Sequence, residues 1–138
     1  PFSLTGKRYP TYLIKKMGLT PETYFSRSLY LRNHDNSIQA VQRGIVGAAA
    51  VDSLVFDYLA TKKPHRVKDL KIILKSPPFG IPPVVVRKGL SRQLKNQLKE
   101  ALLVMHQNKE GRKILSKMLI DRFVTGNDKM YDSVREIE

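Results

Sequence analysis

Short apolar segments alternate with amphipathic segments along the first half of this 138-residue chain, and this alternation constrains its fold more than any single motif. Short apolar runs bounded by turn residues predict strands, whereas apolar residues repeating every three or four positions predict helices. Strands that alternate with helices indicate an α/β fold with a largely parallel sheet flanked by helices. We expect strands at 28–32, 46–51 and 70–74, and helices at 7–17, around 38–41 and around 55–59.

A proline-rich segment, residues 76–83, separates this pattern from the rest of the chain. Its four prolines exclude a helix and limit pairing in a sheet, because proline lacks a backbone N–H and its ring fixes φ. Beyond it, apolar residues at helical spacing predict one helix capped by Ser91 and a second around 114–119. A last short helix is expected within 127–137. With 41% apolar residues, the chain is able to bury a core.

The residue inventory excludes or disfavours several classes of protein. The chain has no cysteine, and His34, His65 and His106 lack the spacing of metal ligands, so we expect neither a metal nor a cofactor. No arrangement of nucleophile and base is visible, so we do not expect an enzyme or catalytic residues. No segment has the length of a membrane span or the pattern of a signal peptide.

The chain carries a formal net charge of +13, which on electrostatic grounds suggests nucleic acid as a partner. Its basic residues are spread from Lys7 to Arg135 without a block of five or six, and no zinc-finger, RNP-like or helix-turn-helix pattern is present. A basic nucleic-acid-binding module is therefore the least favoured hypothesis. We expect a solvated basic surface that attracts small anions.

Three predicted helix starts carry side chains suited to binding an anion. Residues 3–6, Ser-Leu-Thr-Gly, begin the first helix, where backbone N–H groups lack partners and the helix dipole is positive. His34 and Asp52 each follow a predicted strand and precede a helix. Ser, Thr and Asp are also ordinary N-cap residues, so each start alone is a weak signal. Because ligands lie at the carboxyl ends of parallel strands, we expect the three starts to share one cleft.

Five short motifs occur in a fixed order along nearly the whole chain. They are Pro1-Phe2-Ser3-Leu4-Thr5-Gly6; Asn33-His34-Asp35 with Ile38 and Ala40-Val41; Gly44 through Asp52-Ser53; Lys75-Ser76-Pro77-Pro78 with Val86-Arg87-Lys88; and Tyr131-Asp132 with Val134-Arg135. In this order they resemble the carboxyl-terminal half of phosphonate-type periplasmic binding proteins. These are the solute receptors of ABC importers for phosphate, phosphite and phosphonates.

The resemblance implies a periplasmic-binding-protein type II-like fold, in which two α/β lobes close on the ligand. The chain begins at Pro1 rather than at a methionine, and we expect it to be a fragment of such a two-lobe protein. The resemblance implies a second ligand-binding lobe at 1–76. It implies a proline-rich connection and hinge crossing at 77–88, and carboxyl-terminal helices that return to the first lobe at 89–138.

The resemblance also implies ligand contacts. The family's Ser-Thr-Ser anion loop falls on Ser3, Leu4 and Thr5, so two hydroxyls remain and Leu4 offers its backbone N–H. The family's ligand-contacting histidine falls on His34, which donates an N–H to an anionic oxygen.

Asp52, Leu54 and Pro82 bear on the class of ligand. Asp52 either faces the ligand or serves only as a helix cap. A carboxylate that faces the ligand accepts a proton, which favours protonated phosphate, phosphite or a phosphonate monoester over sulfate. Leu54 and Pro82 occupy the places where relatives that bind aminoalkylphosphonates carry carboxylates, so we do not expect an aminophosphonate.

These features predict the substrate-binding component of an ABC transporter, which binds a phosphorus oxyanion between its lobes and delivers it to a membrane permease. We expect a periplasmic protein, or an extracellular lipoprotein anchored to the membrane, that is monomeric at full length and binds no nucleic acid. The alternative is a ligand-sensing domain of a signalling kinase or of a transcription regulator, which the full gene would distinguish.

Overall fold

The computed structural model describes residues 3–137, which divide into two compact units. Residues 3–79 together with 132–137 form the first unit, and residues 80–131 form the second. The predicted lobe boundaries at 76 and 88 stay a prediction. No helix among residues 3–137 combines the length and apolar character needed to span a membrane.

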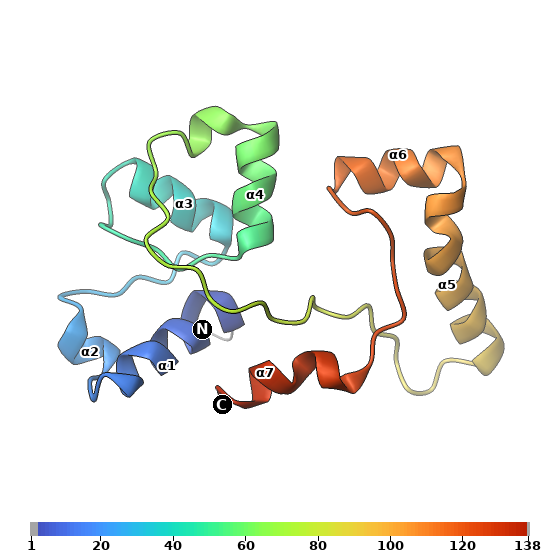
Figure 1. Cartoon of the computed structure of the whole chain (residues 1–138), viewed down its shortest axis with the longest axis horizontal. Helices are drawn as coiled ribbons and strands as arrows, with labels where there is room; N and C mark the ends of the chain where they lie inside the picture. Colours follow the sequence, from blue (N-terminus) through green and yellow to red (C-terminus); the bar gives the residue numbers. More distant parts are fainter. Residues whose placement is uncertain (1–2, 138) are drawn as a thin grey trace. The chain divides into compact units, whose positions relative to one another are not determined.

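The first unit consists of helices joined by extended segments (Figure 1). Two glycines end the first and third α-helices, since Gly18 and Gly44 adopt φ values of +75° and +68°, which glycine reaches without strain. The helices predicted at 7–17, around 38–41 and around 55–59 are confirmed. The elements are η1 (Leu4–Arg8), α1 (Tyr9–Lys16), α2 (Pro21–Tyr24), α3 (His34–Gln42), α4 (Ser53–Lys62), η2 (Pro64–Arg66) and α7 (Asp132–Arg135).

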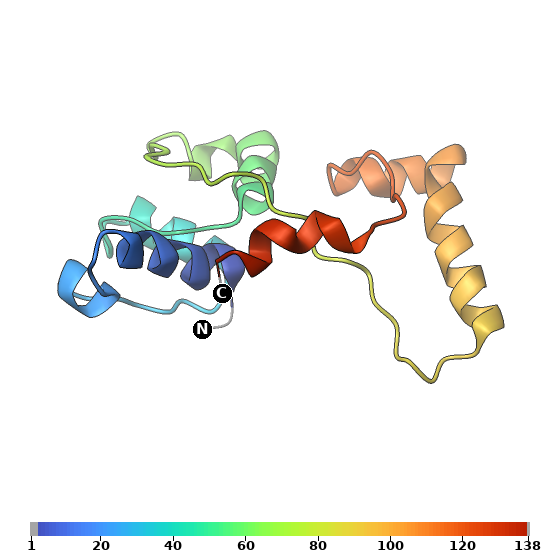
Figure 2. The same cartoon turned by 60° about the horizontal axis from the view of Figure 1, so that its bottom comes forward.

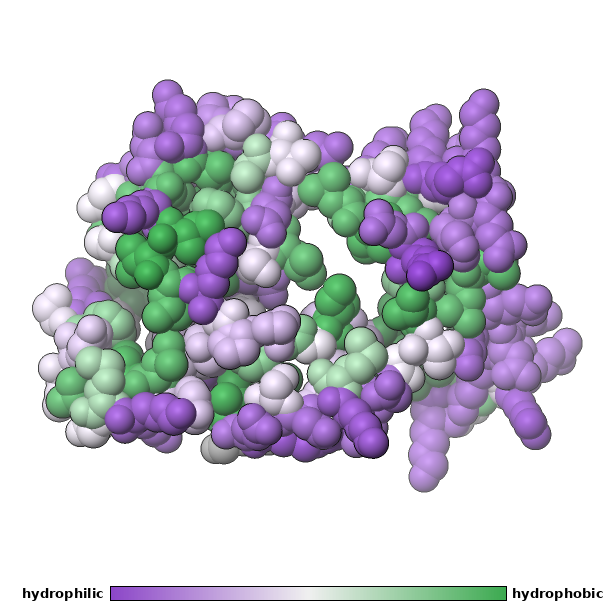
Figure 3. All heavy atoms as spheres, viewed as in Figure 1, coloured by the Kyte–Doolittle hydropathy of each residue, from purple (hydrophilic) through white to green (hydrophobic). Residues whose placement is uncertain are grey.

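The second unit holds the long helix predicted after Ser91 and the helix predicted around 114–119. Ser91 accepts from the Leu94 amide at 3.3 Å, and Asn108 accepts from the Gly111 amide at 2.7 Å, so both helices begin at capping side chains. Hydrophilic side chains cover much of the outer surface of these helices (Figure 3). The elements are α5 (Arg92–Val104), η3 (Met105–Gln107), α6 (Lys109–Lys117) and η4 (Asp128–Tyr131).

The predicted parallel sheet is wrong for the part of the chain that the structure describes. Residues 28–32, 46–51 and 70–74 contain no strand, and residues 76–83 form neither helix nor strand. A helix satisfies its backbone groups within one segment, whereas a strand requires a second strand beside it. Without such a neighbour the apolar side chains of the third segment remain accessible, and Ile73 is 78% exposed. The helices predicted after segments 28–32 and 46–51 are therefore present, but the strands predicted before them are absent.

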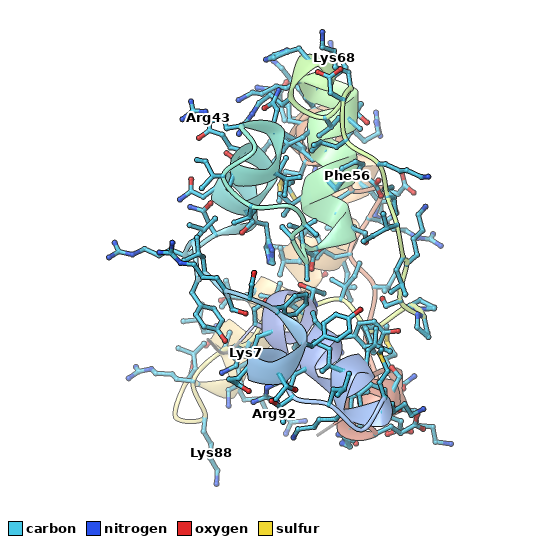
Figure 4. The ribbon with its side chains drawn as sticks, turned by 90° about the vertical axis from the view of Figure 1, so that its left-hand side faces the viewer. Lys7, Arg43, Phe56, Lys68, Lys88 and Arg92 are labelled. Carbon is cyan, nitrogen blue, oxygen red and sulfur yellow. The ribbon has the colours of Figure 1, made fainter. Side chains whose placement is uncertain are left out.

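A small core holds α3 against α4 in the first unit. Ile38, Leu59 and Val67 are 2%, 4% and 7% exposed and pack together, with partly buried residues around them. α3 and α4 lie side by side in both ribbon views (Figures 1 and 2). Phe56 lies on α4 and Arg43 at the carboxyl end of α3 (Figure 4). This core fixes where the amino-terminal ends of the two helices lie.

Polar contacts join both ends of α3 to η2. Arg66 Nη1 donates to the two carboxylate oxygens of Asp35 at 2.9 and 3.1 Å, at the start of α3. At the other end, the Gln42 side-chain amide donates to the His65 carbonyl at 3.1 Å. The Asp35–Arg66 pair is partly exposed and contributes at most about 1 kcal/mol. The two contacts together orient α3 relative to η2, because they hold the helix at two points along its length.

Candidate functional site

The helix starts at residues 3–6, at His34 and at Asp52 come together in the first unit. A Cβ placed on Gly6 would stand 3.5 Å from Cε1 of His34 and 3.1 Å from Oγ of Ser3. On its other side, Nδ1 of His34 accepts a hydrogen bond from the backbone N–H of Asp52 at 3.3 Å. The imidazole of His34 therefore lies between the start of η1 and the start of α4.

The first helix start is capped by the side chain of Ser3. Oγ of Ser3 accepts from the Gly6 amide at 3.0 Å, and the Ser3 carbonyl accepts from the Lys7 amide at 3.1 Å. Because Oγ acts as acceptor in this bond, its hydroxyl proton stays available as a donor. The amides of Leu4 and Thr5 open the helix and have no intrahelical partner. The Leu4 and Thr5 amides and the Ser3 hydroxyl thus lie at the positive end of a helix dipole.

His34 is the first residue of α3, whose cap is strong. Oδ1 of Asn33 accepts from the Asn36 amide at 2.7 Å, so the helix begins at a defined residue and the His34 side chain leaves from its first turn. The side chain is half-buried. Burial of Ile38, one turn further along, holds this end of the helix in place.

Asp52 is the N-cap of α4. This is one of the two roles that the sequence left open for it. Oδ1 of Asp52 accepts from the Leu54 amide at 2.9 Å, while the backbone amide of Asp52 is directed to His34. Contact between this carboxylate and a protonated anion stays a prediction. Leu54 is 55% exposed and brings no charge to the start of α4, and Pro82 belongs to the second unit.

Lys7 adds a positive charge to the first helix start. Its ammonium lies 5.4 Å from the centre of the Tyr30 ring, within the range of a cation–π contact (Lys7 is labelled in Figure 4). Tyr30 lies in the extended segment that leads to α3, so the contact joins two parts of the chain that border the site. The charge of Lys7 therefore adds to the positive potential on this part of the first unit, which favours negatively charged ligands.

Two groups away from these helix starts have shifted pKa values. Hydrogen bonding to its own backbone amide, and then to Thr20, lowers the pKa of Glu22 in the first turn of α2. A hydrogen bond with the Tyr12 side chain raises the pKa of Lys16 at the end of α1. The positive charge of Lys7 also contributes to the lowered pKa of Glu22. Within residues 3–137, no group of three or more His, Asp or Glu side chains is placed to hold a metal ion.

Comparison with known proteins decides the family. Residues 1–131 match the family described as "ABC transporter, phosphonate, periplasmic substrate-binding protein". The chain belongs to this phosphonate-binding family of substrate-binding proteins. It is also 26% identical over 137 residues to the phosphonates-binding periplasmic protein of Escherichia coli (strain K12), an alignment that covers 99% of this chain and 40% of that relative.

Membership of the phosphonate-binding family confirms the resemblance inferred from the five motifs. The family consists of solute-binding proteins rather than enzymes, and a match to transport proteins does not favour the alternative of a sensor or regulator. The chain spans about two-fifths of the length of the curated relative that it matches. The ligand roles of Ser3, Leu4, Thr5, His34 and Asp52 stay predictions.

Two features of this site were not predicted from the sequence. Asp52 was assigned by its carboxylate, whereas the hydrogen bond to His34 comes from the backbone amide. Lys7 was also passed over, and its place in the first helical turn was the available signal. The contact between Asp52 and His34 joins residues 18 positions apart, and no local pattern encodes such a distance.

Proposed function

We propose that the protein containing this chain is the substrate-binding component of an ABC transporter and binds a phosphorus oxyanion at the three helix starts. The observation that supports this most is the meeting of residues 3–6, His34 and Asp52 in one place. A tetrahedral oxyanion presents several acceptor oxygens and is satisfied by several donors converging from different segments. The donors proposed here are the amides of Leu4 and Thr5, the hydroxyls of Ser3 and Thr5, and one N–H of His34.

The proposed ligand is phosphate, phosphite or a simple phosphonate. The site offers neutral donors and the Lys7 charge, whereas the positions that would hold an ammonium group are Leu54 and Pro82. An aminophosphonate would leave its ammonium without a carboxylate at these positions, and an unpaired charge in a closed site is costly. Asp52, if it faces the ligand, accepts a proton that sulfate does not carry near neutral pH.

The remaining parts of the proposal follow from the family. The protein would act in the periplasm, or outside the cell on a lipid anchor, as a monomer that closes around its ligand and presents the closed form to a membrane permease. In the full-length protein, segments 28–32, 46–51 and 70–74 would gain partner strands and form the sheet of a type II binding-protein lobe. The exposed apolar side chains of segment 70–74 are consistent with that pairing.

The test is a thermal-shift titration of the full-length protein with phosphate, phosphite, methylphosphonate, aminoethylphosphonate and sulfate. A ligand that binds only the folded protein raises its melting temperature, and at a hundred times Kd the stabilisation is about 2.7 kcal/mol. We expect a shift with one or more of phosphate, phosphite and methylphosphonate, and none with aminoethylphosphonate or sulfate. No shift with any phosphorus oxyanion would refute the proposed function.

A pair of histidine variants locates the site. His34→Ala removes the proposed donor and is expected to abolish most of the shift. His65→Ala is the matched control, because His65 is exposed, lies at the opposite end of α3 and contributes its backbone carbonyl to Gln42. Equal losses in the two variants would place the ligand elsewhere.

A further inference from the structure

The hydrogen bond between the Asp52 backbone and the His34 ring determines which ring nitrogen carries the proton. The Asp52 amide can only donate, so Nδ1 of His34 must present a lone pair to it. In a neutral imidazole that has its lone pair on Nδ1, the proton sits on Nε2. We infer that the Asp52 backbone amide is a positioning group, which holds His34 in the Nε2–H tautomer so that the ring acts as a fixed hydrogen-bond donor.

Two further observations show how the His34 ring is held. Cε1, the carbon between the two ring nitrogens, lies 3.5 Å from the Cβ position of Gly6, so this edge of the ring faces the start of η1. The Asp52 amide itself is held in place because its side chain caps α4 at 2.9 Å and Leu59 buries that helix in the core. The ring is therefore anchored on the Nδ1 side by a rigid helix start.

This assignment rests on the proposed function for its consequence, because an oxyanion oxygen requires a donor from the imidazole. The opposite tautomer would turn a lone pair toward a negatively charged oxygen, which repels it. A misplaced tautomer would therefore have to be reversed before the ligand bound. The role assigned to Asp52 belongs to its backbone, and it holds whether or not its carboxylate touches the ligand.

The backbone assignment can be tested because Asp52 has a φ of −72°, which proline adopts without strain. Asp52→Pro removes both the amide donor and the carboxylate cap. Asp52→Ala removes the same cap and keeps the amide. Because the proline Cδ takes the place of the amide hydrogen that faces His34, the difference between the two variants reports loss of this N–H together with a displacement of the ring.

The experiment records long-range 1H–15N correlations of the histidine rings in ligand-free, 15N-labelled full-length protein, with His34→Gln used to assign the signals of His34. We expect the Nε2–H pattern in wild type and in Asp52→Ala, and a mixture of tautomers in Asp52→Pro. We also expect Asp52→Pro to bind phosphate about twofold more weakly than Asp52→Ala if the two tautomers are equally populated, because Kd rises in inverse proportion to the fraction that carries the proton on Nε2.

Each outcome is decisive for one of the two proposals. A proton on Nδ1 of His34 in the wild-type protein would overturn the inference. This measurement does not depend on whether any variant folds. A tautomer population in folded Asp52→Pro equal to that in Asp52→Ala would overturn it as well. The Nε2–H pattern in a protein that binds none of phosphate, phosphite and methylphosphonate would support the positioning role while refuting the proposed function.

Discussion

The core under α3 gives the most direct quantitative prediction, the substitution Ile38→Ala. Ile38 is 2% exposed and packs with Leu59 and Val67. The substitution removes three carbons, worth about 2.4 kcal/mol at roughly 0.8 kcal/mol for each buried group. The cavity left behind adds to this transfer term, and comparable substitutions cost about 2 to 5 kcal/mol in all. We expect a loss in this range for the unit that carries the site.

Native-state hydrogen exchange of the α3 and α4 amides, recorded on the 138-residue chain, measures this loss in the first unit. A destabilisation of about 2 to 5 kcal/mol accelerates exchange roughly thirty-fold to several-thousand-fold. The matched control is Ile73→Ala, which removes the same carbons from a side chain that is 78% exposed. We expect less than about 0.5 kcal/mol for the control, as for most surface substitutions.

The two isoleucine variants together test whether Ile38 holds α3 against α4. An acceleration below tenfold in Ile38→Ala would mean that this side chain does not hold α3 against α4. An equal acceleration in Ile73→Ala would mean that segment 70–74 is covered, in contradiction to its exposure here. The oxyanion affinity of the full-length protein should fall with Ile38→Ala, because the same helix presents His34.

Three further predictions concern helix ends and helix packing. Gly111→Ala should destabilise the second unit by about 1 to 3 kcal/mol in thermal denaturation, because a Cβ there would overlap the Met105 carbonyl. The control Gly89→Ala should leave the stability unchanged, because a Cβ at that position meets no atom within 4 Å. If both behave alike, the close approach of η3 to α6 is wrong. Asn33→Ala should cost about 1 kcal/mol of α3 stability by loss of its cap, measured by exchange of the α3 amides, and unchanged exchange would contradict the cap. An NMR titration should place the pKa of Glu22 below 4.5. The contribution of Glu22 to stability is therefore present above pH 4.5 and is lost as the pH falls through the lowered pKa. A pKa at or above 4.5 would contradict the hydrogen bonds to the Glu22 carboxylate.

Helix boundaries were predictable because their signals are local. Ser91 begins α5, and Gly18 and Gly44 end helices where the sequence indicated. Each signal involves a side chain and backbone groups within about four residues, so no distant contact is needed to read it. The strands predicted at 28–32, 46–51 and 70–74 are absent from this chain, because a strand forms only beside a partner strand, which no local signal supplies.

The sequence by itself determined the helix starts, the residue types at them and, through five ordered motifs, the family. Tertiary structure alone decided that His34 lies between residues 3–6 and Asp52, and that a backbone amide rather than a carboxylate faces the ring. The physical reason is that the apolar core of Ile38, Leu59 and Val67 sets the relative placement of α3 and α4. Burial of apolar side chains is non-directional and acts between distant residues, so its geometric result appears only when the helices pack.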